Sequence, residues 1–163
     1  MEKSRAIFFE YNDEEIHFDL GTFALCMYYA VTLNSTKAKK LFDATLTEWA
    51  YRFNYELSEG NLTSNDLEAH FVTSDILEAI TFIENDLIPA LNNEKQDLLK
   101  QYKGISNFIN LYDSTTPFLR FFGVFENDFS HSDGESLAHY MNLLKTALQH
   151  SLSVNQPLII YVL

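Results

Sequence analysis

The sequence predicts an α+β fold: an N-terminal β-hairpin and two later strands, at about 117–126 and 157–163, in one sheet packed by five to six helices. Two β-branched and aromatic runs flank a polar turn near the N-terminus, and several later segments carry apolar residues at helical spacing. A chain of 163 residues can bury a core without disulfides or metals, so we expect a single domain, 1–163.

The hairpin is predicted from two strands on either side of the polar run NDEE, residues 12–15. If all four residues form the loop, Glu10 lies opposite His17, and that imidazole serves as an ion-pair partner. If only the first two turn the chain, Glu10 lies opposite Glu15. Because like charges directly opposed are unfavourable, the longer loop is the favoured interpretation. The two strands are expected at residues 5–11 and 16–20.

Helical patterns account for most of the remaining chain. The nearly unbroken apolar run 23–33 predicts a buried helix, and an amphipathic helix is expected after the break at 34–36, reaching about Tyr55. Further helices are expected at 65–71 and at 73–91. Another is expected at 93–103, with caps at Asn93 and Gln96, and residues 105–112 could extend it. The last begins at a Ser132–Glu135 capping box and reaches Leu148.

Two apolar runs in the second half of the chain predict strands. Residues 118–125, FLRFFGVF, follow a Thr-Thr-Pro turn, and Gly123 marks a bulge or the close approach of another backbone. Residues 158–163, LIIYVL, are apolar throughout, which predicts a central strand of the sheet.

The helix predicted over 73–91 combines the strongest periodicity with an unusual surface. Its buried stripe is expected to consist of Ile76, Ile80, Ile83, Leu87 and Leu91. Asp75 with Glu78 predicts a capped start, and Pro89 predicts a kink or an end between Asn85 and Ile88.

Opposite that stripe, Asp75, Glu78 and Asp86 flank a phenylalanine, Phe82. Two interpretations are open. Phe82 packs beneath another element of the chain, or it is an apolar anchor inside an acidic contact patch.

Charge is strongly unbalanced, with 23 acids against 11 lysines and arginines and a net charge of −12. This disfavours nucleic acid and anionic membranes as partners, because phosphate contacts need cations. Asp66 and Glu68 extend the acidic region, which either keeps the chain soluble or attracts a basic protein. Lys37, Lys39 and Lys40 would be explained by internal ion pairs with this region or by solubility.

Composition also bears on location. The single Cys26 lies in an apolar run and cannot form an intramolecular disulfide. The acidic N-terminus does not resemble a signal peptide, and no apolar run reaches the ~20 residues of a membrane span. A cytoplasmic protein is therefore expected.

Motifs for catalysis are sparse. The five glycines are too scattered for a phosphate-binding loop, and neither G-x-S-x-G nor H-E-x-x-H occurs. The strongest constellation is His131, Asp133, Glu135 and His139, whose nitrogen and oxygen atoms suit a metal. Glu135 is already needed for a capping box and Asp133 suits the helix dipole, so no cofactor and no enzymatic activity are predicted.

In size, acidity and lack of catalytic motifs, the chain resembles the immunity proteins of bacterial toxin systems, including those of contact-dependent growth inhibition. The resemblance implies a non-enzymatic protein that covers the cationic active site of a nuclease-type toxin. The expected contacts are Asp66, Glu68, Asp75, Glu78, Phe82 and Asp86.

Two alternatives remain. One is a nucleic-acid-mimicking inhibitor from a phage or mobile element. The other is an enzyme or metal-binding protein that uses His131, Asp133 and His139.

Overall fold

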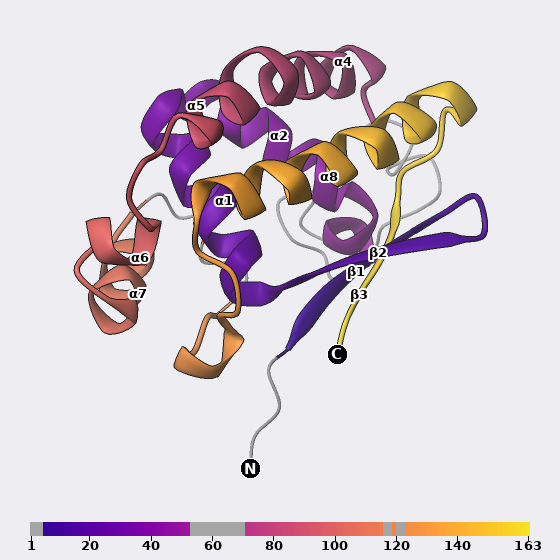
Figure 1. Ribbon diagram of the computed structural model, residues 1–163. Helices are drawn as coiled ribbons and strands as arrows, with labels where there is room; N and C mark the ends of the chain where they lie inside the picture. The colour runs from indigo at the N-terminus through magenta and orange to yellow at the C-terminus, as the bar shows by residue number, and fades with distance from the viewer. Residues whose placement is uncertain (1–4, 53–70, 116–118, 120–122) are drawn as a thin grey trace.

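The computed structural model describes residues 5–52, 71–115, 119 and 123–163, and it confirms the α+β class (Figure 1). Its antiparallel sheet has three strands in the order β2-β1-β3. The strands are β1 (Ala6–Tyr11), β2 (Glu14–Asp19) and β3 (Ile159–Val162). The helices are α1 (Leu20–Leu33), α2 (Ser35–Arg52), α4 (Thr73–Phe82), α5 (Ile88–Asn92), α6 (Leu98–Gln101), α7 (Ile105–Asp113) and α8 (Gly134–Val154), with a π turn η1 (Ile83–Leu87) and a 3-10 turn η3 (Glu126–Asp128).

The hairpin has the shorter of the two loops considered, so the favoured four-residue loop is wrong. Asn12 and Asp13 both have positive φ, 49° and 61°, as a two-residue type I′ turn requires. The register then pairs Glu10 with Glu15. Asn and Asp tolerate this left-handed backbone, and the repulsion of two carboxylates in water is weak by comparison.

The helices cover one face of the sheet, as Figure 1 shows. Side chains on that inner face are fully buried. They are Ile7, Phe9, Phe18 and Ile160. The rings of Tyr11 and His150, from β1 and α8, lie 5.6 Å apart, so α8 runs across the inner face. Because side chains alternate along a strand, Phe8, Glu10, Glu15, His17, Ile159 and Tyr161 belong to the opposite, outer face.

The last strand lies at 159–162 as predicted, but it is an edge strand and not the central one. The central position belongs to β1. On the outer edge of β3, the amide of Ile160 donates to a carboxylate oxygen of Glu48 in α2, at 3.3 Å. The apolar character of the strand has a different origin, since Ile160 enters the core while Ile159 is 54% exposed.

The strand predicted at 117–126 is wrong for every described residue in that range. Leu119 and 123–125 are not in a strand, and residue 126 begins η3. Leu119 is fully buried and Val124 nearly so. The apolar pattern therefore reflects loop residues that enter the core, and such a pattern does not distinguish a loop from a strand.

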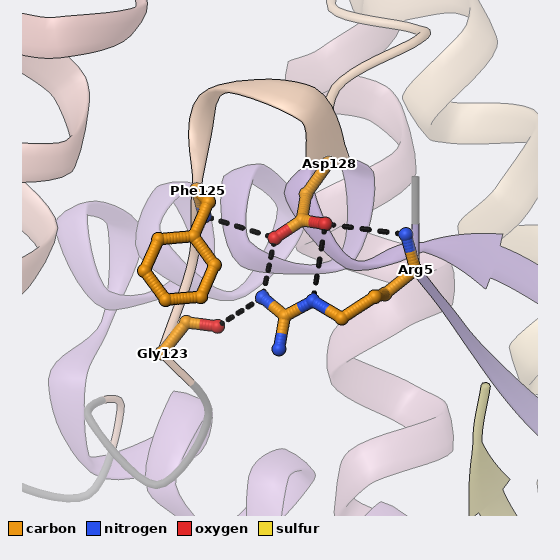
Figure 2. Close-up of polar contacts among 4 residues, drawn as sticks. All are labelled: Arg5, Gly123, Phe125 and Asp128. Carbon is orange, nitrogen blue, oxygen red and sulfur yellow. Dashed lines mark hydrogen bonds and ion pairs between the residues drawn. The ribbon is translucent and has the colours of Figure 1, made fainter. Parts of the chain in front are cut away.

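A buried carboxylate fixes this loop to the start of β1 (Figure 2). Asp128 is 2% exposed and receives the guanidinium of Arg5 at 2.6 Å, the backbone N–H of Arg5 at 3.2 Å and the N–H of Phe125 at 2.9 Å. Arg5 also donates to the carbonyl of Gly123 at 2.9 Å and lies 4.8 Å above the ring of Phe125. The loop thus has a polar framework that replaces strand pairing.

Helix α8 lies where the sequence predicts a helix, and its buried stripe contains Leu137, Met141, Leu144 and Leu148. Its cap is Asp133, which accepts the N–H of Ser136 at 2.9 Å, so the predicted Ser132–Glu135 box is wrong by one residue. The first residue, Gly134, packs against the end of α5. A Cβ atom there would lie 2.1 Å from the carbonyl oxygen of Leu91, so only glycine permits this approach.

The short helix α6 is capped by Asp97, which accepts the N–H of Leu99 at 2.9 Å, and not by Asn93 or Gln96 as predicted. Gly104, with a φ of 101°, separates α6 from α7. Residues 105–112 therefore belong to a helix of their own and do not extend the preceding one.

The helix predicted over 73–91 is continuous but not regular. It starts at Thr73 after Val72, and no side chain caps it, so the Asp75–Glu78 cap is wrong. The expected disturbance takes the form of η1, in which the N–H of Ile88 reaches back to the carbonyl of Ile83. This wider turn accommodates Pro89, which has no N–H to donate.

Asp128→Asn is expected to lower the free energy of unfolding by about 2–3 kcal/mol, because an amide cannot accept all the N–H groups that converge on this buried site. Urea unfolding followed by circular dichroism would measure the change. Glu126→Gln, an exposed neighbour in the same turn, serves as the control and should change stability by less than about 0.5 kcal/mol. An Asp128→Asn variant as stable as the parent would contradict this role.

Asp13→Gly is expected to stabilise the fold by about 0.5–1 kcal/mol, since glycine adopts the left-handed conformation of this turn position without steric cost. Asp13→Ala at the same position should lose a similar amount. Thermal unfolding of the two variants would show shifts of opposite sign. Shifts of the same sign would mean that this turn does not have the φ values described.

Candidate functional site

The predicted anchor, Phe82, is buried in the core with 1% of its surface exposed. The exposed-anchor interpretation is therefore wrong, and the alternative in which Phe82 packs beneath another element is confirmed. Helix α4 packs against both α2 and α8. Two neighbours bury a wider arc of the helix than the single stripe that periodicity indicates.

The acidic side chains around Phe82 meet lysines of the same chain. Lys40 forms an ion pair with Glu78 and lies 3.9 Å from Asp75, and Lys37 lies 3.5 Å from Asp86. The hydrogen bond to Glu78 raises the pKa of Lys40. The internal pairing considered for the lysines is thus confirmed for these two. Lys39 instead pairs with Asp43, at 2.7 Å.

A hollow of about 530 Å³ lies between the start of α2 and α4. It contains exposed apolar surface from Leu77, but Lys37 and Lys40 stand in its wall beside Glu78. Because the lysines offset the acidic side chains, the electrostatic attraction of a cationic partner to this hollow is weak. Asp66 and Glu68, which were also predicted as contacts, lie outside the described residues.

The enzyme-like constellation does gather in one place. His131, Asp133, Glu135 and His139 line a shallow hollow of about 400 Å³ beside Tyr140. Within the described parts of the chain, however, no three His, Cys, Asp or Glu side chains are arranged to hold a metal ion.

Three members of this constellation, Asp133, His131 and His139, have contacts within the chain. Asp133 caps α8, and the N–H of Ser136 lowers the pKa of its carboxyl. The rings of His131 and His139 lie 5.5 Å and 6.0 Å from that of Tyr140.

A second acidic group, absent from the predicted site, surrounds the end of the hairpin. A hollow of about 500 Å³, here called the hairpin hollow, is lined by residues 10–15 and by Ile159. Its carboxylates are Glu10, Asp13, Glu14 and Glu15. Among the residues that the structure describes, no cation forms an ion pair with any of the four.

The outer sheet face, made by Phe8, Glu10, Glu15, His17, Ile159 and Tyr161, adjoins this hollow. Phe8 stacks on Tyr161 with ring centroids 4.7 Å apart and an angle of 5°, and on its other side His17 lies 5.3 Å away. The hydroxyl of Tyr161 donates to Glu15, and this bond raises the pKa of the phenol to about 12. An aromatic strip thus ends beside a group of carboxylates.

Two signals in the sequence could have revealed this site. The segment EYNDEE is denser in acids than any part of the predicted site. Phe8 also falls on the side of the first strand that alternation assigns to solvent. The favoured long loop concealed the site, because in that register Glu10 meets His17 and not Glu15.

Comparison with protein-family models, with curated proteins and with solved structures found no match. Among the described residues, no helix has both the length and the apolar character needed to cross a membrane. The arrangement therefore defines a class only: an α+β protein whose sheet presents aromatic rings next to an acidic hollow.

Asp133→Ala is expected to cost about 1 kcal/mol of stability through loss of the helix cap, and Asp133→Ser should restore most of it, since serine also caps helices. Because the pKa of Asp133 is lowered in the folded state, the cap contributes fully above the unfolded pKa of about 3.9 and is lost as pH falls through the folded value. Urea unfolding between pH 7 and pH 2 would measure both effects. Equal stability of the Ala and Ser variants would contradict a capping role.

Proposed function

We propose that this chain is a non-enzymatic inhibitory protein, an immunity protein that neutralises a basic toxin of the nuclease type. The observation that carries the proposal is the hairpin hollow, where four carboxylates surround an exposed isoleucine and none is paired with a cation of the described chain. This surface replaces the acidic face of α4 as the proposed contact.

Electrostatics support a cationic partner. Four carboxylates around one hollow repel each other, and a basic surface brought among them would relieve that repulsion. The carboxylates of α4 and η1 offer less, because Glu78 and Asp86 already form ion pairs with Lys40 and Lys37. The net charge of −12 adds long-range attraction, which accelerates association and makes it dependent on salt.

Apolar contacts support a protein partner. Ile159 is 54% exposed beside the hollow, and Phe8 and Tyr161 continue the apolar surface across the sheet. An exposed isoleucine next to partly exposed aromatic rings, inside a charged rim, resembles the composition of binding hot spots. A nucleic-acid mimic would instead need carboxylates spaced along an extended surface, whereas these surround a single hollow.

A nuclease has the basic surface that this proposal requires of the partner. A nuclease active site carries cations that bind phosphate. An acidic protein that docks there would exclude the substrate without any chemical step, which agrees with an inhibitor that needs no catalytic group.

The proposal is tested by co-expression with the product of the neighbouring gene, which is expected to be the toxin. Protection from growth arrest and a complex stable to gel filtration are expected, with an affinity that falls at least about tenfold between 50 and 200 mM NaCl. If the cells are not protected and no complex forms, the proposal is overturned.

A matched pair of variants locates the contact. Glu10→Gln with Glu14→Gln should weaken the complex about tenfold or more, whereas Asp75→Asn with Glu78→Gln, which removes the same charge from α4, should weaken it less than about threefold. Equal losses would mean that only net charge matters and that the hairpin hollow is not the contact.

A further inference from the structure

We infer that the outer sheet face binds an arginine side chain of the partner, with the guanidinium stacked on the ring of Tyr161 and hydrogen-bonded to Glu10 and Glu15. This inference rests on the proposed function and specifies the chemistry of its contact. It follows from the order of side chains across the three strands.

The register places the ring and both carboxylates together. Phe8 pairs with Tyr161 across the β1–β3 ladder, and Glu10 pairs with Glu15 across the β1–β2 ladder, two residues further along the same face. The hydroxyl of Tyr161 reaches Glu15, so the tyrosine side chain extends across β1 toward these acids. One flat surface and two carboxylates thus occupy adjacent positions.

The ring is suited to a cation. A phenol that donates to a carboxylate stays protonated, and the adjoining negative charge strengthens the attraction of a cation to the ring face. One face of Tyr161 packs on Phe8, and the side chain is still partly exposed. A cation can therefore approach while the stack on Phe8 holds the ring in place.

The two carboxylates are suited to a guanidinium group, which presents several N–H donors in one plane. Glu10 and Glu15 lie directly opposite each other, a repulsive arrangement in the free protein. A guanidinium is planar, stacks on aromatic faces and presents several N–H groups in one plane, whereas an ammonium is compact and strongly hydrated. Arginine can satisfy the ring and the acids together, and lysine cannot.

If the ring pair served only to stabilise the sheet, charge alone would govern binding. Peptides of six arginines and of six lysines, acetylated and amidated, would then bind equally well. Stacking predicts that the arginine peptide binds about five- to tenfold more tightly at the same ionic strength. Isothermal titration calorimetry measures the ratio, and NMR shifts of the Tyr161 ring locate the contact.

Three variants test the assignment. Tyr161→Leu should abolish the preference for arginine, and Tyr161→Phe, which keeps a ring, should retain part of it. Glu15→Gln keeps the ring and should weaken arginine binding about threefold or more, so the test does not depend on one variant folding. The paired change Asp75→Asn with Glu78→Gln controls for net charge and should leave the arginine-to-lysine ratio unchanged.

The inference is overturned if the two peptides bind equally, or if Tyr161→Leu leaves the ratio intact. Such a result with the toxin still neutralised would leave the proposed function standing. A preference for arginine without neutralisation of any toxin would have the opposite meaning, because the site would exist and the proposed function would be wrong.

Discussion

The ion pair between Arg5 and Asp128 fixes the turn before α8 to the start of the sheet. Asp128 contacts the residue that directly precedes β1, and β1 is the central strand of the sheet. With the carboxylate 2% exposed, its charge is tolerable only because several N–H groups converge on it. The helices of the inner face, the hairpin and the outer sheet face all take their positions from this strand.

The acidic residues fall into two electrostatic classes, although composition alone cannot separate them. Those of α4 and η1 form ion pairs with lysines at the start of α2 and help to hold these segments together. Those of the hairpin hollow have only tyrosine hydroxyls as polar side-chain partners among the described residues. A carboxylate that already forms an ion pair within the fold attracts a cationic partner less than an unpaired one does. The hairpin hollow is therefore the more favourable place for such a partner to bind.

The sequence predicts long, periodic elements well and local choices poorly. The hairpin strands, the stripe of α8 and the helix around η1 follow from spacing, because burial on one side enforces it. Three features depend instead on tertiary neighbours: the burial of Phe82, the absence of a strand at Leu119 and at 123–126, and the edge position of β3. Two effects compete in setting the hairpin register, the conformational preference of the turn residues and the repulsion between Glu10 and Glu15. The conformational preference makes the larger contribution to the free energy.

Asp13 occupies a turn position that glycine would fill with less strain, and the left-handed backbone there costs the native state some free energy. The side chain at this position supplies a fourth carboxylate to the hollow, in a turn of only two residues. If a cationic partner docks there as proposed, a two-residue turn has little backbone freedom to lose, so little conformational entropy would be lost. Local strain and like-charge repulsion raise the free energy of the unbound protein, and a complex that releases the repulsion recovers part of it as affinity.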